Sequence, residues 1–341
     1  MQRTLALVLA CSIASCARPP DPAEPAATST ASTSSRPEAE AEARIEWNGS
    51  EVVLASLDEA RSVLGSSDDF TRAMGDFDRG VRMGSDAPSS ERAFLEHAAA
   101  QARAWPSDVA ARWASAATEI GNALRGLGLR FPPKVLLIVS SGKEEMDAPY
   151  TRGNAIIIPI STATRLSDPF QLMAHEMFHV ASRHDPKIRD PLYAELGFRR
   201  VPLVAYPKEI AQRRITNPDA ISFEHAITVK RKADGGMLDV VALFYSRKPL
   251  AEAIPAGLEA SLALELVELP GGPDGPRIIP VATTDYLERA TINTEYAIHP
   301  EETLADNFSL ILRRRAKRAP EIKRPDVLDK IEHSLASPLT K

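Results

Sequence analysis

The stretch Asp168–Ser182, which reads DPFQLMAHEMFHVAS, predicts a helix. Asp168 is a good N-cap, Pro169 suits the first helical position, and apolar residues recur at helical spacing up to about Ser182. Two short apolar runs precede it, KVLLIVS at 134–140 and AIIIPI at 155–160. Both are rich in β-branched residues and bounded by turn residues, so both predict buried strands ahead of the helix.

The centre of this helix reads HEMFH, from His175 to His179. Histidines four residues apart on a helix lie one turn apart on the same face, so their imidazoles can bind one metal ion together. Glu176 then lies close enough to hold a metal-bound water and to accept its proton. Only seven histidines occur in 341 residues, so on the order of 0.01 chance occurrences of HExxH are expected. The pattern therefore indicates a metal site.

This motif resembles that of zinc peptidases, whose catalytic zinc is usually held by three protein ligands and a water. Metzincins place a third histidine six residues after the second, but that position is Asp185 here, so the metzincin pattern fails. Gluzincins instead use a glutamate on a later helix, with an acid four residues further on. Residues 299–308 read HPEETLADNF, and Glu302 and Asp306 have this spacing on one helical face.

The gluzincin resemblance covers 175–179 and 302–306, and it implies one Zn²⁺ per chain held by the two histidines and Glu302. Asp306 would accept a hydrogen bond from a zinc histidine and fix its tautomer. Two alternatives for the third ligand stay open. Glu301 is adjacent but aligns better with an apolar stripe, and Glu195 lies at a more usual distance along the chain but lacks an acid four residues later.

The same resemblance implies peptide-bond hydrolysis by a zinc-activated water with Glu176 as general base. The oxyanion needs a donor besides zinc. Tyr296, Tyr286 and His299 precede the Glu302 helix and are candidates, with Tyr296 preferred. Zincins pair an extended substrate with an edge strand, so 154–158 is expected to line the cleft.

The remainder of the chain predicts an α+β fold. Apolar residues at helical spacing over 51–64, 68–83, 89–104 and 107–127 indicate a helical N-terminal region at 45–130. Strand-like composition recurs over 223–232, 237–246, 261–269 and 277–281, followed by helical patterns at 300–315 and 326–336. We therefore expect a zincin-like catalytic domain at 131–341, with a β-rich insertion between the two zinc-ligand helices.

The first sixteen residues, MQRTLALVLACSIASC, have the layout of a secretory signal, with an apolar run too short to span a bilayer. Ile13–Cys16 resembles a bacterial lipobox, which implies a signal peptide at 1–15 and a lipid anchor on Cys16. Cys11 is a weaker candidate, and Ala17 favours the outer membrane, facing periplasm or exterior. Residues 16–44 are rich in Pro, Ala, Ser, Thr and Glu and predict a disordered tether.

Composition excludes some functions. The net charge of −5 gives no argument for nucleic-acid binding, which usually shows a basic stripe or a high isoelectric point. Both cysteines, Cys11 and Cys16, precede the folded part, so its metal must be held by His, Asp or Glu. We expect a peptide or protein substrate. The alternatives are a non-enzymatic lipoprotein with a structural zinc and a zinc hydrolase of other substrates. A structural site usually has four protein ligands and needs no base, so Glu176 favours the enzyme.

Overall fold

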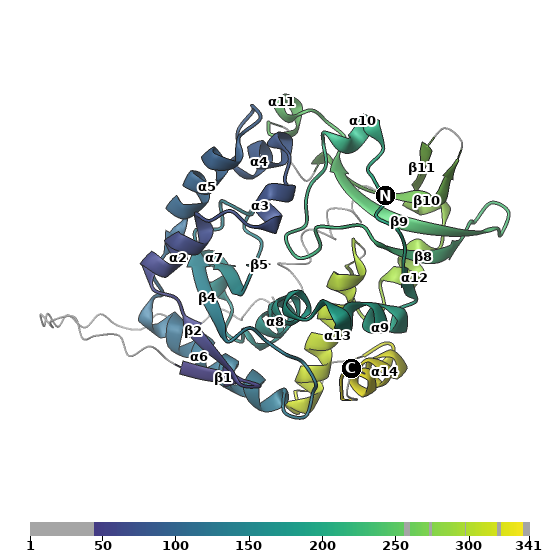
Figure 1. The fold of residues 1–341 in the computed structure, drawn as a ribbon. Helices are drawn as coiled ribbons and strands as arrows, with labels where there is room; N and C mark the ends of the chain where they lie inside the picture. The colour runs from purple at the N-terminus through teal and green to yellow at the C-terminus, as the bar shows by residue number, and fades with distance from the viewer. Residues whose placement is uncertain (1–43, 256–259, 273–274, 297, 319–321, 337–341) are drawn as a thin grey trace, which may run out of the picture.

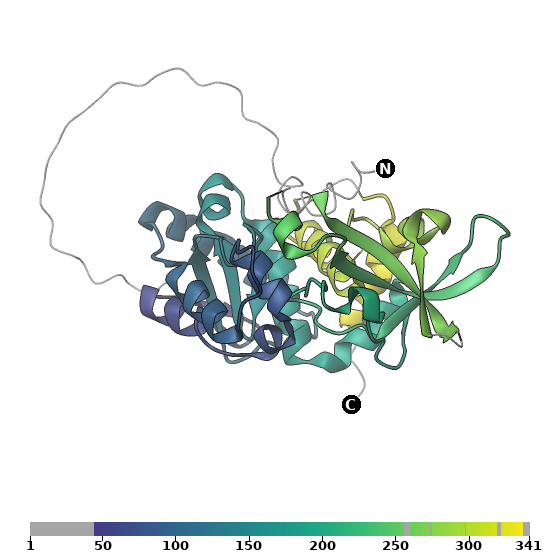
Figure 2. The same ribbon diagram turned by 90° about the horizontal axis from the view of Figure 1, so that it is seen from above.

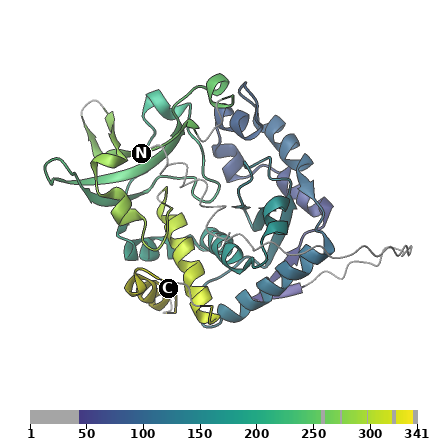
Figure 3. The ribbon, with the colours of Figure 1, turned by 180° about the vertical axis from the view of Figure 1, so that it is seen from behind.

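The structure, a computed structural model, describes residues 44–255, 260–272, 275–296, 298–318 and 322–336. The expected signal peptide, both cysteines and the tether up to residue 43 lie outside the described residues. The fold is α+β, with a mixed six-stranded sheet and an antiparallel five-stranded sheet. Helices α8 and α13 lie between the two sheets, as both the front and the back views show (Figures 1 and 3).

The first sheet has the strand order β1-β2-β4-β6-β5, and β3 also pairs with β4. Strands β2, β4 and β6 are parallel, whereas β1 and β5 are antiparallel to their neighbours. Asn48 and Gly49 both have positive φ, which suits the tight turn between β1 and β2. The strands are β1 (Arg44–Trp47), β2 (Ser50–Leu54), β3 (Ala102–Arg103), β4 (Lys134–Ser140), β5 (Tyr150–Arg152) and β6 (Ala155–Pro159).

Helices cover both faces of this sheet, so its central strands are apolar throughout. On β4, Leu136 and Ile138 pack in one core cluster and their neighbours, such as Leu137, in another. The first cluster is covered by α2 (Leu57–Leu64), α3 (Asp69–Ala73) and α5 (Glu91–Ala100), with α4 (Asp76–Arg82) beside them. The second is covered by α6 (Ser107–Ala123), α7 (Ile160–Arg165) and α8 (Phe170–His184).

The second sheet is antiparallel, in the order β11-β10-β9-β8-β7, and the chain forms it between α8 and α13. The view from above shows it as the core of a second lobe (Figure 2). Its strands are β7 (Phe198–Arg200), β8 (His225–Lys230), β9 (Met237–Ser246), β10 (Leu262–Gly272) and β11 (Gly275–Pro280). The four strands predicted over 223–281 are confirmed to within a few residues.

Short helices connect these parts, and two longer helices close the chain. The short ones are the 3-10 turns η1 (Pro186–Ile188) and η3 (Val281–Thr283) and the helices α9 (Arg189–Glu195), α10 (Lys208–Ala211), α11 (Leu250–Ala253) and α12 (Tyr286–Ala290). The longer ones are α13 (Pro300–Arg315) and α14 (Pro325–Ala336), close to the bounds predicted for both. None of the described helices has the length and apolar character needed to cross a bilayer.

Two expectations about this architecture are corrected. The helix predicted over 51–64 begins only at Leu57, because Ser50–Leu54 forms strand β2 beside β4. The segment 45–130 therefore contributes strands to the sheet as well as helices. The strand Ala155–Pro159 is an inner strand and not the edge, because the antiparallel strand β5 lies outside it.

Candidate metal centre

Helix α8 places the histidine pair in the interior of the molecule. The helix begins at Phe170, one residue later than predicted, with Pro169 in place of Asp168 as N-cap. Asp168 Oδ1 still accepts a hydrogen bond from the Phe170 N–H at 3.1 Å. His175 and His179 are 8% and 1% exposed, so both imidazoles are withdrawn from solvent. Buried polar rings need partners, and those come from α13.

Helix α13 begins as its sequence predicts. Pro300 is its first residue, and His299 caps it by accepting a hydrogen bond from the Glu301 N–H on Nδ1 at 3.1 Å. The helix packs against α8, where the rings of Phe178 and Phe308 have centroids 5.4 Å apart. This packing brings the first turn of α13 against the histidine pair.

The two histidines and Glu302 form a buried group that could hold a metal ion. Nε2 of His175 and Nε2 of His179 are 3.1 Å apart, and Oε2 of Glu302 lies 3.3 Å from the first and 3.6 Å from the second. An ion with tetrahedral bonds of about 2.0–2.1 Å needs its ligand atoms about 3.3 Å apart. The three atoms thus form a triangle of the size that such an ion requires.

Two further carboxylates fix the orientation of the imidazoles. Oδ1 of Asp306 lies 2.7 Å from Nδ1 of His175, and Oε1 of Glu301 lies 3.0 Å from Nδ1 of His179. Each Nδ1–H can therefore donate outward, which leaves the Nε2 lone pairs for the ion. Asp306 lies where the gluzincin spacing predicted. Glu301 also lies beside the centre, but it contacts Nδ1 of His179, and none of its atoms belongs to the triangle of candidate ligand atoms.

Glu301 is itself held on several sides. Ser182 Oγ donates to its Oε1 at 2.6 Å, and the Tyr193 hydroxyl donates to Oε2. Such support for a residue that orients a ligand is typical of metal sites. By contrast Glu195, the other candidate for the third ligand, accepts a hydrogen bond from Ser334 Oγ at 2.9 Å on α14 and belongs to neither candidate metal group of the described chain.

Glu176 is buried beside the triad, and its Oε2 has no hydrogen-bond partner among the described residues. Burial raises the pKa of this carboxyl to about 8, although the two neighbouring histidines act to lower it. Burial alone would lower the pKa of His175, but the Asp306 and Glu302 carboxylates raise it to about 10. The centre therefore favours added positive charge, which either a proton or a metal cation can supply.

The three candidates for the oxyanion donor have different surroundings. The Tyr296 ring centroid lies 5.8 Å from that of His175, and its side chain is half-buried. Tyr286 is packed in the main hydrophobic core on α12. His299 caps α13, and its buried Nε2 has no hydrogen-bond partner within the described ranges. Tyr296 is thus the candidate whose ring lies against His175.

Sequence reasoning missed the loop that follows α10. Asn217 donates from Nδ2 to Oε1 of Glu302 at 2.6 Å, which leaves Oε2 for the centre. Asp219 contributes a carboxylate oxygen to a second group with Glu176 and His179, whose atoms lie within 4.8 Å of one another. The Asn-Pro-Asp stretch has turn composition, and no local signal distinguishes it from an ordinary surface turn.

The chain matches no known protein family, no curated protein and no solved structure.

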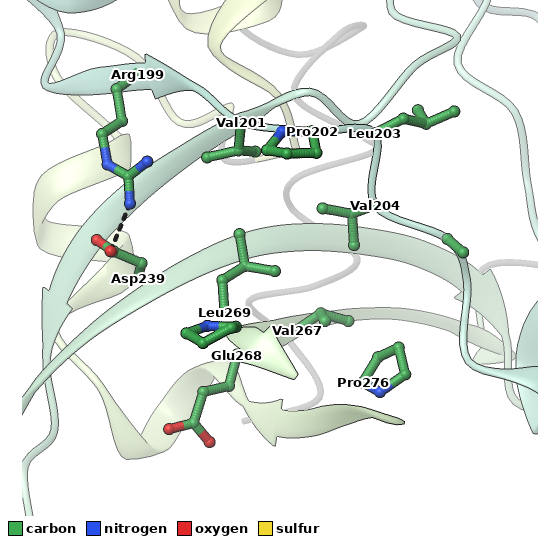
Figure 4. A pocket seen from close by; sticks show the side chains of 12 residues that line it. Arg199, Val201, Pro202, Leu203, Val204, Asp239, Val267, Glu268, Leu269 and Pro276 are labelled. Atoms are coloured by element: carbon green, nitrogen blue, oxygen red, sulfur yellow. Dashed lines mark hydrogen bonds and ion pairs between the residues drawn. The ribbon is translucent and has the colours of Figure 1, made fainter. Parts of the chain in front are cut away.

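A separate pocket of about 370 Å³ lies on the second sheet (Figure 4). The Arg199–Asp239 ion pair, at 2.5 Å, forms part of its wall. The pocket shares no residue with the metal centre. Its lining is mostly apolar: Arg199, Val201, Pro202, Leu203, Val204, Ala205, Asp239, Val267, Glu268, Leu269, Pro270 and Pro276.

Proposed function

We propose that this protein is a zinc-dependent peptidase whose ion is held by His175, His179 and Glu302. The observation that carries the proposal is the triangle of ligand atoms 3.1–3.6 Å apart, with the unpartnered Glu176 Oε2 beside it. Two imidazoles and one carboxylate are a donor set typical of catalytic zinc. Three protein ligands also leave a fourth position open, which a structural zinc site does not have.

The chain's own side chains supply the other parts of a hydrolytic site. When bound, the ion supplies a Lewis acid that polarises a carbonyl and acidifies water. Glu176 takes a proton from the attacking water and passes it to the leaving amine. A cation at the triad lowers the pKa of Glu176 by charge attraction, which favours the basic form that this role needs. Tyr296, beside His175, is the donor proposed for the oxyanion.

A peptide is the proposed substrate because an edge strand lies next to the centre. Strand β5 is the edge of the first sheet, and α8 packs against it. An extended chain can pair with such an edge through its main-chain groups. This assignment replaces Asn154–Ile158, because Ala155–Ile158 lie in the inner strand β6 and Asn154 is in the turn before it. The whole arrangement, two helices with zinc ligands and an edge strand beside them, is the support for a zincin-like, gluzincin-type domain.

Attachment to the bacterial outer membrane is proposed from the sequence. The lipobox-like Ile13–Cys16 supports a lipid on Cys16, and residues 16–44 would then give the folded part clearance from the surface. The proposed substrates are peptides or proteins on the periplasmic or external side of the membrane.

The proposal is tested by zinc content and cleavage measured on the same samples. Purified wild type is expected to hold one zinc per chain and to cleave an unstructured protein such as casein. His175→Ala and Glu302→Ala should lose the metal, while Glu195→Ala should keep it. Glu176→Gln should keep the metal but lose about 10²–10⁴-fold in rate. Zinc with no cleavage of peptides would favour the structural or non-peptide alternatives, and no zinc in wild type would overturn the proposal.

A further inference from the structure

The loop Thr216–Asp219 brings an additional carboxylate to the metal centre. The group formed by Asp219, Glu176 and His179 has its ligand atoms within 4.8 Å of one another. The Asp219 side chain is only 7% exposed, so it is turned inward from its loop. Glu176, whose buried Oε2 lacks a hydrogen-bond partner in the described chain, belongs to this same group.

This second group would not bind a second ion. His179 belongs to both groups, and its Nδ1 already contacts Glu301 at 3.0 Å. Only Nε2 is left, and it also faces Glu302 at 3.6 Å. One ring nitrogen binds one metal ion, so both groups surround a single centre. Asp219 then lies on the Glu176 side of it, where the attacking water and the substrate carbonyl must fit.

Asp219 also takes up a hydrogen-bond donor of β5, the edge strand with which a peptide would pair. The Thr151 N–H donates to Asp219 Oδ1 at 3.2 Å, and the Thr151 hydroxyl donates to the same oxygen. Thr151 is opposite Ile156 of β6, yet its N–H is directed away from that strand. In an antiparallel edge strand, outward-directed groups of this kind are those that pair with an added strand.

Further contacts hold the loop in this position. Asn217 donates to Glu302 Oε1 at 2.6 Å, and its own Oδ1 accepts from the Asp219 N–H at 2.9 Å. Arg183, from α8, donates to Asp219 Oδ1 at 3.3 Å. At the other end, the Thr216 N–H donates to buried Asp78 Oδ2 at 2.8 Å. The loop is thus held by α4, by α8 and by the proposed ligand Glu302.

Charge makes this seat incompatible with substrate. Glu176 and Glu302 already balance a divalent cation, and Asp219, which is paired with Arg183 at 3.3 Å, adds a further carboxylate beside the centre. A carboxylate in that place takes up space that an incoming carbonyl oxygen needs and repels that oxygen, and both effects oppose the entry of substrate.

We infer that Asp219 is an internal latch: its carboxylate blocks the substrate side of the metal centre, and peptides enter only when the loop 216–219 moves away. The inference rests on the proposed function, because it concerns access to the same centre. It implies that the seated form is latent and that cleavage follows the small fraction of molecules in which the loop is open.

The test compares the full-length protein with its Asp219→Ala variant in two measurements. One is the rate at which a chromophoric chelator removes zinc, and the other is the cleavage of casein. Asp219→Ala is expected to release zinc about tenfold faster and to cleave about tenfold faster, because the closed population is lost. Arg183→Gln removes the ion pair that holds Asp219 in place but keeps the Asp219 carboxylate, so it should raise both rates by less than Asp219→Ala does. Asp86→Ala, an exposed carboxylate on another loop, is the matched control and should match wild type.

The outcomes separate the latch from the proposed function. Faster zinc release with no cleavage by any variant would support the latch and count against the peptidase. Unchanged release and cleavage in both Asp219→Ala and Arg183→Gln would overturn the latch while leaving the peptidase intact. Loss of cleavage with zinc retained would also overturn it, because Asp219 would then assist the reaction. A wild type without zinc would overturn both.

Discussion

Glu301 Oε1 lies 3.0 Å from Nδ1 of His179, on the outer side of an imidazole whose Nε2 faces the neighbouring residue Glu302. Loss of such an outer partner typically weakens metal binding 10–100-fold. We therefore expect Glu301→Gln to bind zinc about 10–100-fold more weakly, measured by competition with a chromophoric chelator. Glu195→Gln should bind like wild type. Equal affinity in the two variants would contradict the role given to Glu301.

Metal removal should lower thermal stability. The triad joins α8 to α13, so an ion binds the folded chain and not the unfolded one. Free zinc at about 100 times its dissociation constant would add about 2.7 kcal/mol to the free energy of unfolding. Scanning calorimetry with zinc and with a chelator measures this. His175→Ala is the control and should show no response to zinc, whereas identical Tm values for wild type in both conditions would exclude a bound ion.

The packing of α13 on α8 should affect both stability and the metal. Phe308→Ala removes a fully buried ring that contacts Phe178, and core changes of this kind cost about 3–5 kcal/mol. We expect denaturant unfolding to show that loss and zinc affinity to fall as well. Phe94→Ala, equally buried on the other face of the first sheet, should cost about as much and leave zinc affinity unchanged. Similar zinc affinity in both variants would argue against this coupling.

A buried acid outside the triad should make stability depend on pH. Burial raises the pKa of Glu145 to about 7, against the lowering effect of its ion-pair partner Arg82, while Asp78 and Glu144 raise it further. Between the unfolded pKa of 4.5 and the folded value, the folded chain holds the proton that the unfolded chain has lost. Stability from this group is therefore full below pH 4.5 and falls as pH rises toward 7.

Glu145→Gln cannot titrate, so its stability relative to wild type should increase between pH 5 and pH 8. Urea unfolding at the two pH values measures the difference. A stability difference between variant and wild type that does not change with pH would show that Glu145 has an ordinary pKa in the folded chain.

The lipid anchor has a direct test in cells. Cys16→Ser removes the thiol that would be acylated, so the protein should move from the membrane fraction to the soluble fraction on cell fractionation. Cys11→Ser should stay with the membrane. If Cys11→Ser alone becomes soluble, the anchor is on the other cysteine.

The parts of the site that the sequence could predict depend on local geometry. His175, Glu176 and His179 lie on one helix, and Glu302 and Asp306 lie on another. Within each helix, the spacing along the chain fixes how the side chains lie relative to one another. The bounds predicted for the second helix, 300–315, agree with Pro300–Arg315 because proline marks its start. Only the docking of one helix on the other had to be inferred from the resemblance to gluzincins.

The misassigned elements depend on tertiary contacts. Glu51–Leu54 has apolar residues that suit a helix as well as a strand, and pairing with β4 decides in favour of the strand. The preceding Asn48-Gly49 is typical of a hairpin turn and could have indicated that a strand follows. No comparable signal marks Asn217 or Asp219, because their importance comes only from the residues that the fold places against them.

Glu302 stands 123 positions after His179, and the whole second sheet is formed between them. A ribosome delivers the chain from its N-terminus, so both imidazoles exist long before their carboxylate partner has been synthesised. During that interval the triad is incomplete, and the two rings alone make a poor zinc site. All three residues can therefore bind the ion together only after α13 has been synthesised and packed on α8, so a chain truncated before α13 cannot form the candidate centre.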